Sequence, residues 1–232
     1  MKTDLNKIRE IAISFLYLNI EIDERIPFIV HHPFTNSSVG SIKENGKLEL
    51  VDLSIEENKN KWHKQFERII NESSLTQLFI MMNKPYRLTF LKYIMPYISK
   101  EDCGIILNTY WLSIEDISGD KNVSTRDIVK IFKYADKRTL LSEDNYEFYK
   151  SLPERITLYR GVTNHNKDKK QAMSYTTDIE VARWFAKRFK SEGEIWKINI
   201  PKSKVLSVIN SNEKEVIVDT SKSMKIEILE VK

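Results

Sequence analysis

The sequence predicts an α+β protein in which a mainly helical N-terminal region precedes a unit of short, mostly antiparallel strands. Residues 1–151 contain runs of apolar side chains at helical spacing. Residues 152–232 instead contain short segments rich in β-branched and aromatic residues, bounded by turn formers. One amphipathic helix interrupts these strand-like segments, which is typical of an α+β unit. The change falls at Leu152-Pro153, so the sequence predicts two regions, which could also form one compact unit.

Helices dominate the predicted N-terminal region. Apolar spacing predicts a helix over residues 4–20 and two helical parts within residues 75–98, separated by Pro85. Residues 26–53 read as extended or irregular, and a short helix is expected over residues 143–151. The serine-acid pairs expected to cap helices are Ser54 with Glu57, Ser99 with Asp102, and Ser124 with Asp127.

Strands dominate the C-terminal region. The predicted segments are 156–162, 173–176, 194–200, 204–209, 215–220 and 224–231. The helix between them is predicted to begin with a capping box made by Thr177 and Glu180, and its apolar face faces the core. Within it, Trp184 and Phe185 are expected to pack in the core, with a place beside a ligand as the alternative.

The composition is that of an ordinary globular chain of one large or two small domains, with 232 residues, 41% hydrophobic and 30% charged. The net charge is +4, and it is unevenly distributed. Residues 151–232 hold 16 of the 37 basic and 11 of the 33 acidic residues, which gives +5 there and −1 elsewhere. A cationic site for a phosphate-bearing ligand would explain this excess, and so would a few solvated lysines.

Several classes of site are not indicated. Cys103 is the single cysteine, so no internal disulfide can form, which fits a reducing compartment. The apolar run at residues 11–20 is too short to span a bilayer and lacks a signal-peptide cleavage site, so we expect a cytoplasmic protein with no membrane partner. No GxGxxG pattern is present, and no metal is expected. The histidines are scattered at positions 31, 32, 63 and 165.

Three short patterns place polar side chains at the ends of predicted strands. Arg160 ends the first strand and can offer a planar fork to phosphate oxygens, while Gly161 after it permits close approach of a ligand. Ser174 and Thr176 alternate onto one face of the second strand. Taken singly, Arg160 is typical of a residue in a surface ion pair. Ser174 and Thr176, which precede a helix, are typical of helix caps and of residues that fill a strand.

The third pattern is a pair of carboxylates, Glu213 and Glu215, directly before an apolar strand. Side chains two apart in a strand point to the same face. A carboxylate at the entry to a buried strand is unfavourable unless it has a partner. Singly, this pattern is also typical of a charged turn that ends where a strand begins.

Together and in this order, the three patterns resemble the Arg-Ser-Glu class of mono-ADP-ribosyltransferases, which includes bacterial toxins and phage-encoded enzymes. The matching motifs are Tyr159-Arg160, Ser174-Tyr175-Thr176 and Glu213-Lys214-Glu215. The connecting segments ARWFAKRF and EIWKINIPKSKVLSVINSNEKEVIVD are also similar to that class. The resemblance covers residues 152–232 only. Tyr175 replaces a small residue, and the polar, basic residues 163–172 do not align with the class.

The resemblance implies an enzyme that uses NAD as its co-substrate and cleaves it at the nicotinamide bond. It implies that Arg160 holds the phosphates or the nicotinamide ribose and that the Gly161 backbone bonds the nicotinamide amide. Ser174 would position the ribose and orient Glu215, with Thr176 as a further NAD-binding residue.

The two glutamates have different implied roles. Glu215 would accept a hydrogen bond from the ribose 2′-hydroxyl and stabilise the oxocarbenium-like state as nicotinamide leaves, as carboxylates do in glycoside cleavage. Glu213 would orient or deprotonate the incoming nucleophile.

The acceptor of ADP-ribose is open at this stage. A glutamate at position 213 favours a protein arginine, by the same resemblance. DNA or RNA is the second choice, because the basic excess and residues 165–170 would suit a phosphate backbone. NAD+ hydrolysis and an inactive binding module are further alternatives. Residues 1–151 would recognise the target, cover the NAD site or bind an inhibitor or antitoxin protein, and a toxin would act in the cytoplasm of a host cell.

Overall fold

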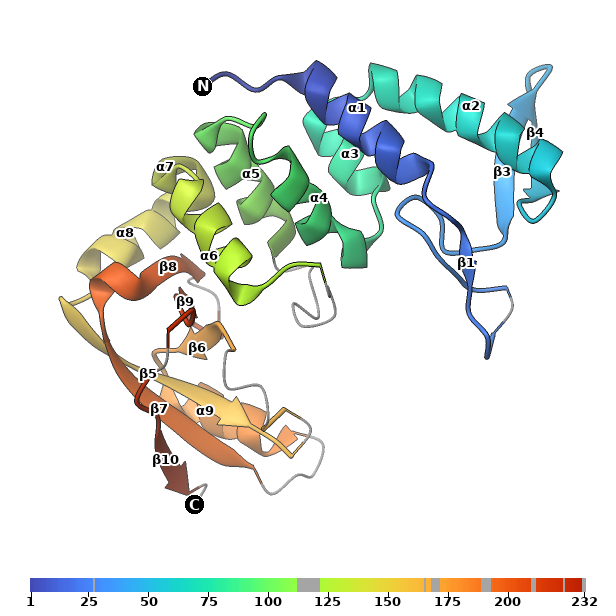
Figure 1. Ribbon diagram of the computed structural model, residues 1–232. Helices are drawn as coiled ribbons and strands as arrows, with labels where there is room; N and C mark the ends of the chain where they lie inside the picture. The colour runs from blue at the N-terminus through green and yellow to red at the C-terminus, as the bar shows by residue number, and fades with distance from the viewer. Residues whose placement is uncertain are drawn as a thin grey trace. The chain divides into compact units, whose positions relative to one another are not determined.

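The computed structural model describes residues 1–26, 28–111, 122–164, 166–167, 172–188, 193–209, 212–222 and 224–230, in two compact units (Figure 1). Unit 1 comprises Met1–Ser99 and Thr109–Val123, and unit 2 comprises Lys100–Asn108 and Ser124–Lys232. The described elements of the chain are helices and antiparallel strand pairs, which confirms the predicted α+β class. The unit boundary differs from the predicted one at residue 151, because helices before it group with the strands after it.

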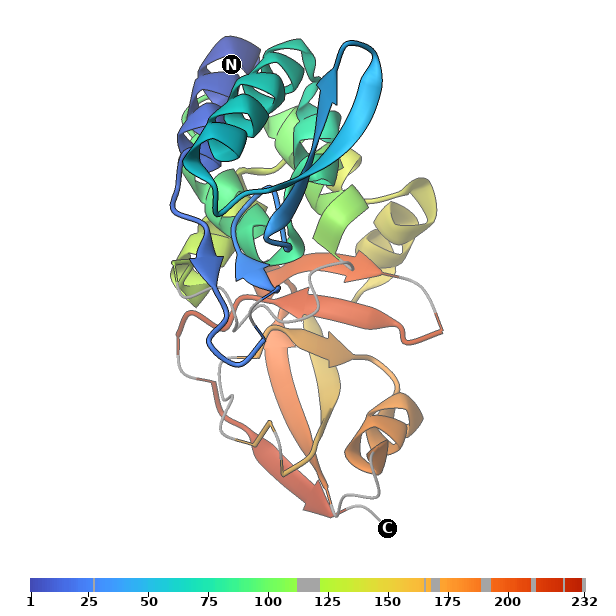
Figure 2. The ribbon, with the colours of Figure 1, turned by 90° about the vertical axis from the view of Figure 1, so that its right-hand side faces the viewer.

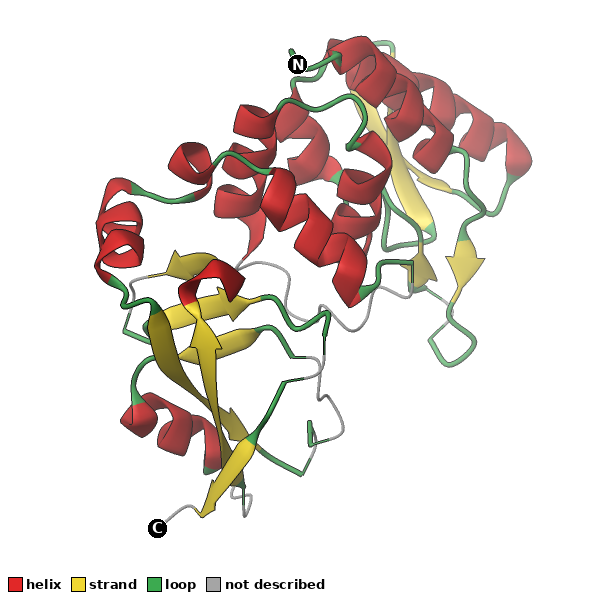
Figure 3. Ribbon diagram, turned by 60° about the vertical axis from the view of Figure 1, so that its left-hand side comes forward, coloured by secondary structure: helices red, strands yellow, loops and turns green. Residues whose placement is uncertain are grey.

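Unit 1 is mainly helical, with two short hairpins (Figure 3). Its helical elements are α1 (Leu5–Leu16), α2 (Glu56–Glu72), α3 (Leu75–Met81), the 3₁₀ turn η1 (Lys84–Tyr86) and α4 (Arg87–Ile94). Its strands are β1 (Glu21–Ile22), β2 (Val30–His31), β3 (Val39–Glu44) and β4 (Lys47–Asp52). The predicted cap at Ser54 is wrong: α2 begins after Ile55 with no side-chain cap. Ser54 bonds to Asp52 instead, through its side chain and through its backbone N–H at 2.8 Å.

The core of unit 1 is aromatic. Phe79 is buried between Phe90 and Tyr110, with ring centroids 5.3 and 5.7 Å away. Trp62 of α2 is also fully buried and lies 4.6 Å from the ring of Phe66. Aromatic side chains of this size bury large apolar areas, so they account for much of the stability of unit 1.

Two histidines are buried beside this core. His32 lies 3.1 Å through Nε2 from the carbonyl of Leu16, and its Nδ1 accepts from the Phe34 N–H at 3.1 Å. Nε2 therefore carries the proton, and the imidazole is satisfied in its neutral form. Burial lowers the pKa of His32 to about 4. Burial also lowers the pKa of His63, whose ring lies 4.6 Å from that of Tyr17.

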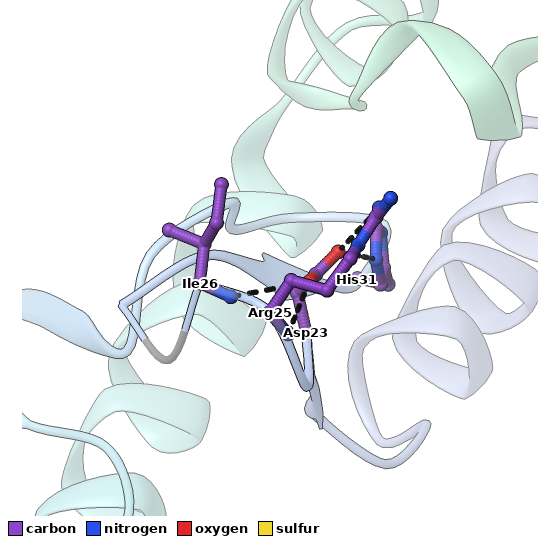
Figure 4. Close-up of polar contacts among 4 residues, drawn as sticks. All are labelled: Asp23, Arg25, Ile26 and His31. Carbon is purple, nitrogen blue, oxygen red and sulfur yellow. Dashed lines mark hydrogen bonds and ion pairs between the residues drawn. The ribbon is translucent and has the colours of Figure 1, made fainter.

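The turn after β1 is held by one carboxylate (Figure 4). Asp23 accepts from the backbone N–H groups of Arg25 at 2.9 Å and Ile26 at 3.3 Å, and its other oxygen lies 3.3 Å from His31 Nε2. These contacts, led by the Arg25 backbone bond, lower the pKa of Asp23. The cluster therefore has a structural role as a local turn.

Unit 2 combines helices with one sheet. Its helical elements are α5 (Lys100–Tyr110, whose last two residues fall in unit 1), α6 (Thr125–Tyr134), α7 (Lys137–Leu140), α8 (Glu143–Ser151), α9 (Ile179–Ala186) and the 3₁₀ turn η5 (Lys202–Lys204). Its strands are β5 (Arg155–Val162), β6 (Ser174–Thr176), β7 (Glu194–Pro201), β8 (Val205–Ile209), β9 (Glu215–Val218) and β10 (Glu227–Glu230). These strands confirm the six predicted segments, and the predicted capping box at Ser124 and Asp127 is present.

Side-chain contacts attach the helices before β5 to this sheet. Lys133 of α6 forms an ion pair with Asp219, directly after β9, at 2.6 Å. Lys137 of α7 donates to the backbone carbonyl of Leu206 in β8. The sulfur of Cys103 in α5 lies 3.9 Å from the carbonyl of Ile131, and burial raises the pKa of this thiol to about 12.

The six-stranded sheet has the order β10-β7-β5-β6-β9-β8, and all neighbours are antiparallel (Figure 2). All eight residues of β5 pair with β7. On its other side, β5 pairs with β6 only at Tyr159 and Thr176. The sheet therefore consists of two three-stranded halves, β10-β7-β5 and β6-β9-β8. The two halves are joined by one residue pair, Tyr159 with Thr176.

Helix α9 packs closely on β5. A Cβ on Gly161 would lie 2.1 Å from the carbonyl oxygen of Ala182, and one on Gly193 would lie 2.2 Å from that of Ala186. Only glycine permits this approach. The predicted N-cap at Thr177 is wrong: the cap is Asp178, which accepts from the Glu180 N–H at 2.9 Å.

Candidate active site

Arg160 lies near the end of β5, just beyond the single pair that joins β5 to β6. Its Nη1 donates to the backbone carbonyl of Ser174 in β6 at 2.6 Å, so a side chain joins the two halves of the sheet. A guanidinium has five N–H donors, and no further hydrogen bond from this one involves the described residues. Burial lowers the pKa of Arg160, and the nearby Tyr175 and Glu215 oppose this shift.

Ser174 connects Arg160 to Glu215. The Ser174 hydroxyl donates to Glu215 Oε1 at 2.5 Å, a distance typical of a charge-assisted hydrogen bond. Thr176 is directly opposite Glu215 across the β6–β9 pair, so Ser174, two residues away, shares a face with that carboxylate. The structure thus brings together three predicted residues that come from three separate strands.

The Glu215 carboxyl group is half-buried at the first position of β9. Burial raises its pKa, and the neighbouring Glu213 raises it further. The Ser174 hydrogen bond and the charge of Arg160 act in the opposite direction, and the net shift is upward. This carboxyl group therefore binds a proton more tightly than an exposed glutamate does.

Glu213 does not share a strand face with Glu215, which corrects the predicted pairing. It is exposed and lies in the turn before β9, and Lys214 between them has φ +44°. A residue in this left-handed region interrupts the alternation of a strand. The Glu213 carbonyl accepts from the Thr176 hydroxyl at 2.7 Å, which fixes the turn beside β6.

Thr176 and Gly161 have structural contacts that the sequence did not reveal. The Thr176 hydroxyl donates to Glu213 and accepts from the Asp178 N–H at 3.0 Å, so both of its functions are occupied by backbone. Gly161 is required by the packing of α9 on β5. Neither arrangement needs a ligand to explain the residue type.

Tyr175 was not among the predicted site residues. Its side chain is 2% exposed, and its hydroxyl is buried with no hydrogen-bond partner in the part of the chain that the structure describes. Burial raises the pKa of this phenol, while the charge of Arg160 lowers it. The one signal in the sequence was a large polar residue where the resembling class has a small one.

The predicted core position of Trp184 is wrong. The side chain is 58% exposed, and its ring lies 4.9 Å from that of Phe185 at an interplanar angle of 80°. The guanidinium of Arg188 lies over both rings, 5.2 Å from Trp184 and 5.6 Å from Phe185. The buried face of α9 is formed instead by Ala182 and Ala186.

Most of the basic segment 165–170 lies outside the described residues. Of its described members, Asn166 accepts from the Thr163 N–H at 2.8 Å, and Lys167 forms an ion pair with Glu194 at 3.0 Å. The positive charge of Lys167 is therefore neutralised by a carboxylate of unit 2.

Two kinds of feature are absent from the described residues. These residues contain no group of three or more histidine, cysteine, aspartate or glutamate side chains arranged to hold a metal ion. None of the described helices has the length and apolar character needed to cross a membrane. Comparison with protein-family models, with curated proteins and with solved structures finds no match for this chain.

Proposed function

We propose that this chain is an NAD+-dependent mono-ADP-ribosyltransferase whose catalytic centre is formed by Arg160, Ser174 and Glu215. One observation carries the proposal. Residues from three strands are joined by two short hydrogen bonds, 2.6 Å from Arg160 to the Ser174 carbonyl and 2.5 Å from the Ser174 hydroxyl to Glu215. This arrangement combines a guanidinium that retains donors with an oriented carboxylate.

The donors and acceptors fit NAD+ as the substrate. Arg160 would bind the diphosphate through the N–H donors that remain after its bond to Ser174, because guanidinium groups match phosphate oxygens well. Ser174 holds Oε1 of Glu215, which leaves Oε2 to accept from a ribose hydroxyl. The net charge of +5 in residues 151–232 would attract an anionic dinucleotide.

In the cleavage step, the bond between ribose C1′ and the nicotinamide nitrogen breaks. Its electron pair goes to the ring nitrogen, so neutral nicotinamide leaves and positive charge develops on the ribose. The ionised Glu215 carboxylate stabilises that charge. Because Ser174 fixes the carboxylate in place, little reorganisation is needed as the charge develops.

In the transfer step, an acceptor nitrogen or oxygen forms a bond to C1′ and loses a proton. Glu213 would receive that proton, because it is exposed beside Glu215 in the turn before β9. A protein arginine is our first choice of acceptor, since its guanidinium would be attracted to the exposed carboxylate.

A nucleic acid is the second candidate acceptor, favoured by a different observation. Trp184 is 58% exposed on α9 and carries the Arg188 guanidinium 5.2 Å from its ring centroid. Exposed aromatic rings beside cations are typical of surfaces on which unpaired bases stack.

We also propose a toxin or effector role in the cytoplasm of a target cell, with an inhibitor or antitoxin protein as a partner. The chemistry supports it, because transfer of ADP-ribose consumes NAD+ and alters a macromolecule. Expression of the wild-type chain should then slow growth, and Glu215→Gln should restore it.

The direct test measures nicotinamide release from NAD+ by the wild type, Glu215→Gln and Glu227→Gln. Glu227 is a matched control, because it is an exposed glutamate of the same sheet that pairs with Lys197 at 3.0 Å. We expect Glu215→Gln to reduce the rate by about 100-fold to 1000-fold, as for loss of a preorganised electrostatic contact, and Glu227→Gln to leave it unchanged. Equal rates for all three proteins would contradict the proposal.

The acceptor is identified in a second measurement. Labelled NAD+ is incubated with the enzyme and a cell lysate, and portions are then treated with protease or nuclease. Label released only by protease supports the arginine acceptor, and label released only by nuclease supports the nucleic acid. Mass spectrometry of the labelled fragment then locates the modified group.

A further inference from the structure

The hydroxyl of Tyr175 is a buried polar group of unit 2 that has no partner in the part of the chain that the structure describes. The side chain is 2% exposed, and no described residue forms a hydrogen bond with the hydroxyl. Buried polar groups in folded proteins nearly always have a partner, so each exception requires an explanation. Tyr175 also lies between Ser174 and Thr176 in β6, next to a residue of the proposed catalytic centre.

The neighbour of this hydroxyl is a cation. Arg160 follows Tyr159 and Tyr175 precedes Thr176, next to the single residue pair that joins β5 to β6, and the charge of Arg160 lowers the pKa of the Tyr175 phenol. Arg160 donates to the carbonyl of Ser174, the residue directly before Tyr175. A phenol beside a guanidinium turns its oxygen towards the positive charge, and its proton then requires an acceptor elsewhere.

A cationic donor and a neutral donor side by side favour an acceptor that carries negative charge. Arg160 is a cation with several N–H groups, and Tyr175 adds a neutral O–H donor beside it. Phosphate oxygens accept several hydrogen bonds at once and carry the opposite charge, whereas ribose hydroxyls and the nicotinamide amide are uncharged. The diphosphate is the part of NAD+ that fits both donors.

We propose that Tyr175 is a further NAD+-binding residue whose hydroxyl donates to a diphosphate oxygen that Arg160 also binds. This inference rests on the proposed function and names the part of the substrate that the residue contacts. It also gives a role to the position at which the chain departs from the small residue of the resembling class. If the hydroxyl bonded only to a trapped water molecule, its removal would leave ligand affinity unchanged.

The test compares Tyr175→Phe with Tyr159→Phe, each made in the Glu215→Gln background so that NAD+ is not consumed. Both substitutions remove one phenolic oxygen, and Tyr159 packs against the buried cluster of Ala182, Ala186 and Ile195. Calorimetric titration gives Kd for three ligands: NAD+, ADP-ribose and nicotinamide riboside. The first two contain the diphosphate, and the third does not.

We expect Tyr175→Phe to raise Kd for NAD+ and for ADP-ribose roughly tenfold or more, the loss of one hydrogen bond to a charged group. Kd for nicotinamide riboside should not change, and Tyr159→Phe should leave all three values unchanged. The melting temperature of Tyr175→Phe should equal or exceed that of its parent, because the substitution removes an unpaired buried hydroxyl.

Two results would overturn the inference. Unchanged Kd values for Tyr175→Phe would show that the hydroxyl contacts no part of the ligand, and equal weakening of all three ligands would exclude a specific diphosphate contact. Nicotinamide release by the wild type separates these failures from failure of the proposed function. If the wild type cleaves NAD+, only the role of Tyr175 is rejected; if it neither cleaves nor binds NAD+, both proposals are rejected.

Discussion

Unit 1 and unit 2 both bury ionisable side chains, but they satisfy them differently. In unit 1, His32 uses both ring nitrogens in contacts with backbone groups, each 3.1 Å long, and its neutral form leaves nothing unused. In unit 2, Arg160 and Glu215 bond to Ser174 through one atom each and retain further donors and acceptors. Burial shifts the pKa values of all three residues.

This difference shows why a shifted pKa alone does not identify a functional site. Desolvation acts on any buried ionisable group, whether its role is structural or catalytic. The feature that distinguishes the Ser174 contacts of unit 2 is unused hydrogen-bonding capacity on two groups of opposite charge. An unpaired buried atom does not distinguish the units, because His63 Nε2 in unit 1 and the Tyr175 hydroxyl in unit 2 both have no partner among the described residues. The predictions below test whether the histidine is structural and whether the sheet contacts are required for the site.

The largest expected effect is in unit 1. His32→Ala removes a ring that is 1% exposed and leaves the Leu16 carbonyl and the Phe34 N–H unpaired. We expect the free energy of unfolding to fall by about 3 to 5 kcal/mol, measured by urea denaturation. His31→Ala is the matched control, since its side chain is 58% exposed, and we expect a change below about 1 kcal/mol. Similar losses for the two variants would contradict a structural role for His32.

The second prediction compares two glycines, one in each unit. A Cβ on Gly161 would lie 2.1 Å from a backbone oxygen of α9, whereas one on Gly40 would meet the end of the Leu53 side chain at 2.7 Å. A side chain can move aside and a helix backbone cannot easily do so. We expect Gly161→Ala to reduce the free energy of unfolding by about 3 kcal/mol and Gly40→Ala by about 1 kcal/mol or less, measured by thermal denaturation.

Equal effects of the two glycine substitutions would show that α9 moves as freely as a side chain. Nicotinamide release provides a second readout for the same pair. Displacement of α9 from β5 would disturb Arg160, the residue before Gly161, so we expect Gly161→Ala to reduce the cleavage rate and Gly40→Ala to leave it unchanged.

The smallest expected effect is a pH dependence of stability. Because the pKa of Glu215 is raised in the folded state, its protonated form favours folding below the ordinary value of 4.5. That contribution is lost as the pH rises through the raised pKa. Glu215→Gln carries no such proton, so its melting temperature should increase relative to the wild type between pH 4 and pH 7.

The rate of NAD+ cleavage by the wild type should rise between pH 4 and pH 7, over the range in which the contribution of Glu215 to stability falls. The ionised carboxylate is the form that stabilises the developing positive charge, so the wild-type rate should rise as Glu215 loses its proton. A wild type that gains stability relative to Glu215→Gln as the pH rises would contradict the raised pKa.

Periodicity and turn residues predicted most of the fold. The strands at residues 156–162 and 194–200 were recognisable because β-branched and aromatic residues follow one another there between turn formers. Helix caps were predicted less well. Ser54 and Thr177 each precede an acidic residue at the correct spacing, yet a cap also needs a backbone that presents the hydroxyl to the helix, and the spacing does not determine that geometry.

The candidate site was partly predictable for a similar reason. Singly, Arg160, Ser174 and Glu215 are weak candidates, and the resemblance of their order and spacing to the Arg-Ser-Glu class is what selects them. The strand pairing then brings them together. The alternation rule failed at Glu213, because Lys214 adopts a left-handed conformation. The unpaired hydroxyl of Tyr175 depends on what its neighbours offer in three dimensions, and no short sequence pattern encodes it.

The burial of Cys103 has a practical consequence for labelling this protein. Its thiol is fully buried, and its pKa of about 12 leaves almost no thiolate at neutral pH. Maleimide reagents attack the thiolate, so they should spare this residue while the protein is folded. A cysteine introduced at an exposed position of either unit would therefore accept a fluorophore selectively, and the native thiol can stay in place during such experiments.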